Sequence, residues 1–312
     1  MEHDVKATLR KWAPDWLVRW AGAARDSWAY RAEYRADRRR FARHSAPEDW
    51  GATRALRGRN LEAQLTKDYH RVEKGLALRA PKQPFGATVL DRLDMLLPVS
   101  VGAPYRPYAE SARDALVAWN ATGVISDEVS PLAEETDRGV SDPDLFFTTR
   151  HSVRDYSDRE VDESTLDHAV QLAINAPSVC NRQSWFVRFY REPAEVRHAL
   201  SFQNGNSGID HVPALALITV DARLFTGSSE RNQGFIEGGL FAMSLSWALH
   251  ALGLDSLMLN LSISNSRMAA LRAGLGLGDH ELVIMMMAIG YGREGRRIAR
   301  SPRRAVNEVR LD

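Results

Sequence analysis

The chain has 312 residues, which is enough for one large domain together with a smaller one. Its formal net charge is +1, without the excess of basic residues that is typical of nucleic-acid-binding proteins, so we expect no nucleic-acid partner. A single cysteine excludes an internal disulfide framework, and the apolar runs are too short to cross a bilayer. Since no secretory signal is visible either, we expect a cytoplasmic protein without membrane association.

Residues 1–125 predict an all-helical N-terminal domain that is rich in Arg, Ala, Leu and Trp. Pro14 and Asp15 suit the first turn of a helix that would run to about Arg43. Prolines at positions 47, 81 and 104 mark turns that would separate the helices that follow. An acidic segment with few aromatic residues comes next, at 126–145, and we predict that it is a linker.

Residues 146–312 combine helical and strand patterns in an order that is typical of the α+β class. Asp162 is expected to cap a helix that ends before Pro177, because a proline disfavours helical geometry in the residue before it. Further helices are expected from Pro193, over 235–252 and after a cap at Ser264. Apolar runs predict four strands, at 185–190, 215–220, 254–259 and 282–289.

Two arginines, a histidine and a serine are concentrated between Arg150 and Arg154. In a helical turn the two arginines would share one face, with Ser152 as a neutral donor between them. A guanidinium stays charged and binds oxyanions through two parallel hydrogen bonds. The cluster therefore suits the dianionic phosphate of a cofactor such as flavin mononucleotide (FMN). The alternative is a solvated basic turn at the start of a domain.

A polar loop at 176–185 lies between a predicted helix and a predicted strand. Ser178, Asn181, Arg182 and Gln183 offer hydrogen-bond donors and acceptors in close succession. Such side chains can satisfy the polar edge of a pyrimidine-like ring, as in a flavin. In the alternative interpretation, the asparagine and glutamine cap backbone groups at the end of the helix.

These two segments, RHSVR at 150–154 and APSVCNRQSW at 176–185, resemble the two signature motifs of the nitroreductase family. A third match follows in the same order near the C-terminal end, with AIGYG at 288–292, SPRR at 301–304 and Glu308-Val309. The resemblance covers roughly residues 146–312 and implies a nitroreductase-like sheet flanked by helices. It also implies an FMN-dependent NAD(P)H oxidoreductase that forms a homodimer, with each flavin bound between the subunits.

The resemblance further implies which residues contact the flavin. The basic segment would hold the phosphate, the ribityl chain or the pyrimidine edge, and Arg154 would stabilise the charge of the reduced ring. The polar loop would approach from the other subunit, and Arg303 or Arg304 would reach the phosphate. An amide in the 204–206 loop would contact the ring edge, and the backbone at 260–261 would point toward N5. The complete set of implied cofactor-binding residues is Arg150, His151, Ser152, Arg154, Pro177, Ser178, Asn181, Gln183, Asn206, Asn260, Leu261, Arg303 and Arg304.

In this family the chemistry takes place on the cofactor. The resemblance therefore implies that NADH or NADPH passes hydride to flavin N5 and leaves, and that a small organic acceptor takes its place in ping-pong turnover. No catalytic acid, base or nucleophile of the protein is needed. No metal site is expected, because the histidines lack metal-ligand spacing and only one cysteine is present.

Three positions depart from the family's pattern. Ser184 stands where proline is commoner, Met243-Ser244 where a Gln-Asn pair is frequent, and Leu261 where glycine is common. Two other functions therefore stay open. One is a non-redox FMN-binding or scaffold protein, and the other is a specialised flavin oxidase or dehydrogenase in a biosynthetic pathway.

Some further residues invite both a structural and a functional interpretation. Cys180 is expected to pack rather than to act as a redox thiol. The pair Gly238-Gly239 is expected to permit close approach of a helix or cofactor. Trp16, Trp20 and Trp28 are expected to pack on the catalytic domain or on a second subunit rather than to form a membrane-surface face.

His70, Glu73 and Lys74 lie three and four residues apart, so they can pair on one face of a helix. Gly75 is expected to terminate that helix. The alternative is a contact of these side chains with substrate or nicotinamide at the mouth of a flavin pocket.

Overall fold

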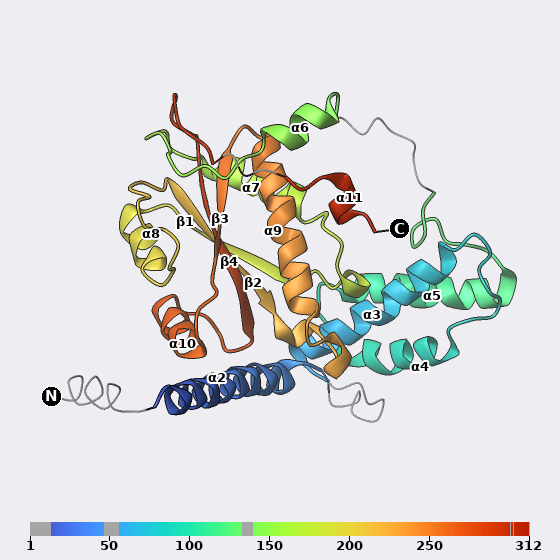
Figure 1. Ribbon diagram of the computed structural model, residues 1–312. Helices are drawn as coiled ribbons and strands as arrows, with labels where there is room; N and C mark the ends of the chain where they lie inside the picture. Colours follow the sequence, from blue (N-terminus) through green and yellow to red (C-terminus); the bar gives the residue numbers. More distant parts are fainter. Residues whose placement is uncertain (1–13, 47–55, 133–139, 300, 302, 312) are drawn as a thin grey trace.

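The computed structural model describes residues 14–46, 56–132, 140–299, 301 and 303–311, and Figure 1 shows how they are arranged. Helices come first along the chain. They are α2 (Asp15–His44), α3 (Gly58–Leu76), α4 (Ala87–Leu96), α5 (Arg106–Thr122) and α6 (Pro143–Thr149), with a 3-10 turn η2 (Leu97–Val99) after α4. The long helix expected from Asp15 to about Arg43 is confirmed, whereas α6 begins inside the segment that was expected to be a linker.

The second part of the chain forms one antiparallel sheet of four strands in the order β1-β2-β4-β3. The strands are β1 (Trp185–Tyr190), β2 (Ala214–Asp221), β3 (Asp255–Asn260) and β4 (Glu281–Gly290). The helices of this part are α7 (Glu163–Ala173), α8 (Pro193–Leu200), α9 (Gln233–Ala251), α10 (Asn265–Gly274) and α11 (Val306–Val309). Three 3-10 turns, η3 (Val179–Asn181), η4 (Ala222–Leu224) and η5 (Ser228–Glu230), connect them.

The sheet is covered by helices on both faces, which explains the uninterrupted apolar run of β2. Successive side chains of a strand point to opposite faces. Ala216 and Ile218 accordingly pack in the core beneath α7 and α9, whereas Leu215 and Leu217 pack in the core beneath α8 and α10. A helical first part followed by a sheet flanked by helices confirms the expected α+β class.

The N-terminal helices α3, α4 and α5 surround a core of their own. Leu65, Val72, Leu93 and Leu116 are among its fully buried residues. Gly75 was expected to terminate α3, but the helix continues to Leu76, so that expectation is wrong. A Cβ atom at Gly75 would lie 2.5 Å from the Phe85 ring, so glycine is required there for packing.

Other expectations on local structure have mixed outcomes. Asp162 stands at the N-cap of α7 but its side chain makes no capping hydrogen bond, whereas Ser264 accepts one from the Arg267 N–H. His70 pairs with Glu73 through Nδ1 and Oε2 at 2.9 Å, which confirms the structural interpretation of that pair.

Trp20 and Trp28 of α2 do not pack on the sheet. Trp20 is 66% exposed and Trp28 is 71% exposed, so this part of the expectation is wrong. The side chain of Trp16 lies outside the described residues. The packed part of α2 is its C-terminal end, where Phe41 is buried in the core beneath α7 and α9.

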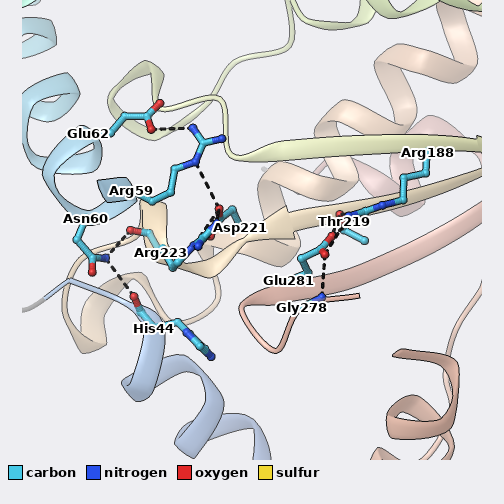
Figure 2. A network of polar contacts seen from close by, with 10 residues as sticks. All are labelled: His44, Arg59, Asn60, Glu62, Arg188, Thr219, Asp221, Arg223, Gly278 and Glu281. Carbon is cyan, nitrogen blue, oxygen red and sulfur yellow. Dashed lines mark hydrogen bonds and ion pairs between the residues drawn. The ribbon is translucent and has the colours of Figure 1, made fainter. Parts of the chain in front are cut away.

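The helical part and the sheet are joined by polar contacts as well as by packing (Figure 2). Asn60 at the start of α3 donates to the carbonyl oxygens of His44 and Arg223, and Arg59 lies 3.8 Å from the buried Asp221 at the end of β2. Thr226, which follows η4, pairs with Ala46 after α2 in a short parallel bridge. These contacts hold α2 and α3 against the end of the sheet where β2 finishes.

A second polar cluster in Figure 2 lies within the sheet. Arg188 of β1 donates twice to Glu281 of β4, at 2.6 and 3.0 Å, and Thr219 of the intervening β2 donates to the same carboxylate. This carboxylate also accepts from the Gly278 N–H. The cluster fixes the register of three neighbouring strands.

Candidate flavin site

The segment Arg150–Arg154 is extended rather than helical, so the expected helical turn is wrong. Arg150 has φ −75° and ψ 114°, Ser152 forms a parallel bridge with Ser256, and Val153 N–H donates to the Ser256 carbonyl at 3.3 Å. The segment therefore runs beside the start of edge strand β3. Alternate residues of an extended chain point the same way, so Arg150, Ser152 and Arg154 still share one side, while Val153 is buried on the other.

An aromatic cluster that the sequence did not reveal positions the start of this segment. Phe146 of α6 stacks on Trp247 of α9 with ring centroids 5.2 Å apart, and the Arg150 guanidinium lies 5.8 Å from the centre of the same indole. His250, one turn further along α9, lies within hydrogen-bond distance of the Thr149 hydroxyl and the Phe146 carbonyl. A tryptophan in an apolar helix gives no signal of such a role before the packing is known.

Arg150 and Arg154 are available for an anion. Within the described part of the chain, no carboxylate lies within ion-pair distance of either guanidinium. Arg154 is exposed and donates to the Ser152 carbonyl at 3.3 Å. Two cations without anionic partners, with Ser152 between them, match the demands of a phosphate group. His151 is half-buried and belongs to the opposite side of the extended segment.

The polar loop before β1 contains an unusual concentration of left-handed backbone. Cys180, Asn181 and Gln183 have φ values of 50°, 51° and 47°. This conformation costs an ordinary residue about 1–2 kcal/mol, so three examples in four residues must be stabilised by their surroundings. Strain of this kind is concentrated at binding sites, and here it leaves Asn181 and Gln183 exposed.

Glu237 of α9 is the principal support of the loop. Its fully buried carboxylate accepts from the Val179 N–H at 2.8 Å and from the Ser184 hydroxyl at 2.6 Å. Burial raises the pKa of Glu237, and the hydrogen bonds from Ser184 and Val179 oppose that shift. Ser184, one of the departures from the family's pattern, thus has a structural explanation, since a proline could not donate to this carboxylate.

Arg182 differs from its polar neighbours in the loop, because it points into the protein. Its Nη2 donates to Glu230 and its Nε donates to the Val179 carbonyl. It was counted among the side chains that could meet a ring edge, and that expectation is wrong. Ser178 has a structural use as well, since its hydroxyl accepts from the Gln183 N–H at 3.0 Å. Pro177 is exposed at the start of the loop.

Two predicted residues lie at the far end of β3. Asn260 is exposed and its Oδ1 accepts from the Ser262 N–H, while the side chain of Leu261 is buried in the core beneath α8 and α10. The Asn260 carbonyl also accepts from the buried Gln203 amide at 3.0 Å. Asn260 and Leu261 therefore lie at the end of β3, whereas the 150–154 segment runs beside the start of the same strand.

The remaining predicted residues have local partners. Asn206 donates to the Leu200 carbonyl at 2.7 Å and so closes the loop after α8, and Asn204 is exposed. Arg303 donates to the Ser301 carbonyl, and both Arg303 and Arg304 are exposed before α11. Nothing in one protomer brings these arginines into contact with Arg150 or Arg154 among the described residues.

One protomer does not bring the two principal segments together. Glu237 anchors the polar loop near the start of α9, and Trp247 contacts Arg150 ten residues later. Ten helical residues span about 15 Å. The loop also precedes β1 at one edge of the sheet, whereas the basic segment lies beside β3 at the other edge. In one chain the two sets therefore lie at opposite edges of the sheet.

Two kinds of site are missing from the described ranges. No group of three or more His, Cys, Asp or Glu side chains there could hold a metal ion. No helix in those ranges combines the length and the apolar character that a membrane span requires.

Comparisons with known proteins agree with the sequence resemblance. Residues 147–204 match the model of the nitroreductase family, and this range contains both the basic segment and the polar loop. A protein of Archaeoglobus fulgidus assigned as an NADH dehydrogenase/NAD(P)H nitroreductase is 23% identical over 146 residues, which cover 47% of this chain and 83% of that protein. The resemblance of the second half of the chain to the nitroreductase family is thereby confirmed.

Solved nitroreductase structures superimpose on about half of the chain. A nitroreductase from Desulfovibrio desulfuricans in complex with FMN superimposes with a TM-score of 0.48 at 20% identity, over 55% of this chain and 98% of that one. An FMN-dependent nitroreductase from Clostridium difficile R20291 has a TM-score of 0.43 at 20% identity, over 50% of this chain and 91% of that one.

Proposed function

We propose that the chain is an FMN-dependent oxidoreductase that uses NADH or NADPH to reduce a small organic acceptor. One observation carries this proposal. Two sets of outward-facing polar side chains both lie within the segment that matches the nitroreductase family. One set is the pair of arginines beside β3, which have no carboxylate partner among the described residues, and the other is the pair of exposed amides in the strained loop.

The residues present fit FMN. Arg150 and Arg154 supply two positive charges on one side of an extended segment, which a phosphate dianion or the charged edge of a reduced ring would neutralise. Asn181 and Gln183 supply amide donors and acceptors for the polar edge of the ring. A flavin bound by these residues would supply the two-electron chemistry between the nicotinamide and the acceptor. The protein orients the reactants and stabilises charge.

We further propose that the site is completed by a second copy of the chain. The two sets lie at opposite edges of the sheet in one chain, so one flavin would meet the basic segment of one copy and the polar loop of the other. Helix α9 supports a homodimer, because it is apolar on all sides and yet Phe235 and Ile236 are 53% and 54% exposed. An apolar surface of this kind marks an interface in a soluble protein.

The domain organisation follows the same proposal. The proposed division is a helical domain at 1–125, a linker at 126–145 and a flavin-binding domain at 146–312, with α6 (Pro143–Thr149) crossing the last boundary. Asn206, Asn260, Leu261, Arg303 and Arg304 would complete the cofactor contacts. The chain acts as a cytoplasmic enzyme on a small molecule and uses no catalytic side chain for proton transfer.

An absorbance spectrum of the purified protein, followed by anaerobic titration with NADPH and then NADH, tests this function. After FMN is added, we expect the protein to show the absorbance bands of bound flavin at nearly full occupancy. One of the two nucleotides should reduce the flavin and abolish those bands. A colourless protein that takes up no FMN would contradict the proposal. A yellow protein that neither nucleotide reduces would instead identify a non-redox FMN-binding protein.

A further inference from the structure

A cavity of about 1240 Å³ lies where α2 crosses the end of the sheet. Its walls are the C-terminal half of α2, the start of α9, the connection between β3 and α10, and the start of β4. Pockets for small organic ligands have volumes of roughly 300–1,000 Å³, so this one has room for a bulky molecule. Helix α2, which lies outside the segment matching the nitroreductase family, contributes one entire wall.

The inner lining of the cavity is apolar. Phe41, Leu261 and Leu282 are buried side chains on its surface, and Met268 and Phe235 lie nearer its opening. A ligand that displaced water from these side chains would be stabilised by about 25 cal/mol for each Å² of apolar surface buried. The lining therefore favours a ligand with ring systems or long alkyl groups.

The charged residues around the cavity are mainly basic. Four arginines line it, at positions 38, 40, 231 and 272, against two acids, Glu33 and Asp37. Glu33 is already engaged by the backbone and side-chain amides of Asn265, and Asp37 lies 3.6 Å from Arg40. Within the described ranges, Arg38 and Arg231 have no carboxylate at ion-pair distance.

Arg272 adds a second, independent indication that the cavity suits an anionic ligand. It is only 8% exposed, and its guanidinium donates to the backbone carbonyls of Gly278 and Glu281 rather than to a carboxylate. Its Nε has no hydrogen-bond partner in the described part of the chain. A buried cation without an anionic partner is costly, and an anion in the adjoining cavity would offset that cost.

The position of the cavity connects it with the proposed reaction. Leu261 is part of its wall, and Leu261 with Asn260 is also where flavin N5 is expected. We propose that this cavity binds the acceptor substrate, and that the substrate is a bulky apolar molecule with an anionic group held by Arg38 and Arg231. This inference rests on the proposed function. It assigns to the N-terminal helix α2 the role of substrate recognition.

Binding can be tested without turnover. The probe is 8-anilinonaphthalene-1-sulfonate, which joins apolar rings to a sulfonate and fluoresces when it is taken out of water. We expect a double variant, Arg38→Ala with Arg231→Ala, to weaken probe binding to the FMN-loaded protein roughly tenfold, since each partly exposed ion pair contributes severalfold. Met268→Ala tests the apolar contact, because Met268 lines the cavity and lies outside the α9 surface proposed for the dimer. Arg39→Ala is the matched control, because Arg39 is an exposed arginine of α2 outside the cavity lining.

Turnover distinguishes this inference from the proposed function. Menadione and its sulfonated derivative are two-electron acceptors that share a ring system, each taking up one hydride and one proton to give the hydroquinone. The double variant should raise KM for the sulfonate about tenfold and leave KM for menadione within twofold. A protein that binds no FMN would defeat the proposed function, while the probe titration would still report on the cavity.

Several results would overturn the inference. One is probe affinity that is equal in the wild-type chain, the double variant and Met268→Ala. Another is loss of FMN from the double variant with probe binding unchanged, which would assign the cavity to the cofactor. A shift of the double variant from dimer to monomer in gel filtration would show that a second copy fills the cavity.

Discussion

The Arg182 side chain is fully buried, and its Nη2 donates to Oε1 of Glu230 at 2.7 Å. This ion pair lies between the polar loop and helix α3. Glu230 also accepts from the Thr226 N–H, and Lys67 of α3 donates to the Thr226 hydroxyl at 3.1 Å. Burial lowers the pKa of Lys67, and the charge of Arg71 lowers it further. The helical part of the chain and the polar loop are therefore linked through one buried polar cluster.

Glu230→Gln should destabilise the protein by about 3–5 kcal/mol, because it leaves the buried Arg182 without its anion. Burial alone would raise the pKa of Glu230, but the hydrogen bond and charge of Arg182 outweigh it and the pKa is lowered. Urea unfolding at pH 7 measures the change. A double variant, Arg182→Leu with Glu230→Leu, should recover more than half of the loss. A single variant that costs under about 1 kcal/mol would show that the pair is not effectively buried.

Glu237→Gln should change how stability depends on pH. The pKa of Glu237 is raised in the folded protein, chiefly by burial, so the folded state holds its proton more tightly than the unfolded chain does. The stabilisation of the folded state by protonated Glu237 is then fully present below the pKa of the unfolded chain. It is lost as pH rises through the higher pKa of the folded protein. Between pH 4 and pH 8, the urea concentration at which half of the protein is unfolded should therefore fall less steeply with pH in the variant than in the wild-type chain.

The control for this series is Glu160→Gln, which removes an exposed glutamate. Its midpoints should follow those of the wild-type chain at every pH. Parallel curves for Glu237→Gln and the wild-type chain would mean that Glu237 titrates normally in the folded state.

Gly238→Ala and Gly239→Ala form a matched pair within α9. A Cβ at Gly238 would lie 2.4 Å from Ile284 of β4, whereas a Cβ at Gly239 would meet nothing within 4 Å. Helix propensity favours alanine at both by up to about 1 kcal/mol, so packing decides the difference. We expect Gly238→Ala to destabilise by about 1–3 kcal/mol and Gly239→Ala to be neutral or stabilising. Equal effects in thermal unfolding would contradict the close approach of α9 to β4.

Asp279 anchors the end of α2 and should make that contact sensitive to acid. Hydrogen bonding from His44 is the largest cause that lowers the pKa of Asp279 to about 2, and Arg40 and Arg43 add to it. A lowered folded pKa means that the stabilisation is present above the unfolded value near 4 and is lost as pH falls toward 2. Because Asp279 is partly exposed, the effect should stay under about 1 kcal/mol and shrink with added salt.

Thermal unfolding of Asp279→Asn alongside the wild-type chain, between pH 5 and pH 2, checks this expectation. The variant should be less stable at pH 5, and the two melting temperatures should converge by pH 2. A difference that stays constant across the range would show that protonation of Asp279 is not involved.

Much of the fold could be predicted because its signals are local. The four strands and the helix from Asp15 to about Arg43 rest on apolar periodicity and on caps such as Ser264, and periodicity survives folding unchanged. Gly75 was misjudged because a glycine reads alike as a helix terminator and as a site of close packing. The Phe85 ring, which decides between the two, lies ten residues away and cannot be placed from the sequence.

The candidate site was predicted by residue type but not by geometry. The basic segment keeps its shared face in an extended form, since residues two apart in a strand and four apart in a helix both align. Trp247 and Phe146 depend on packing between α6 and α9, for which the sequence carries no signal. Glu237 was open to detection, because a lone acid in an otherwise apolar helix calls for a buried partner.

The central claim is that one flavin is held by the basic segment of one subunit and the polar loop of another. A mixed dimer with two affinity tags tests it, one copy carrying Arg150→Ala with Arg154→Ala and the other Asn181→Ala with Gln183→Ala. Each variant alone should form a dimer that loses FMN. The mixed dimer should contain one intact site and retain about one FMN per dimer on flavin analysis. A mixed dimer as empty as either parent would place both halves of the site in a single chain and contradict the account.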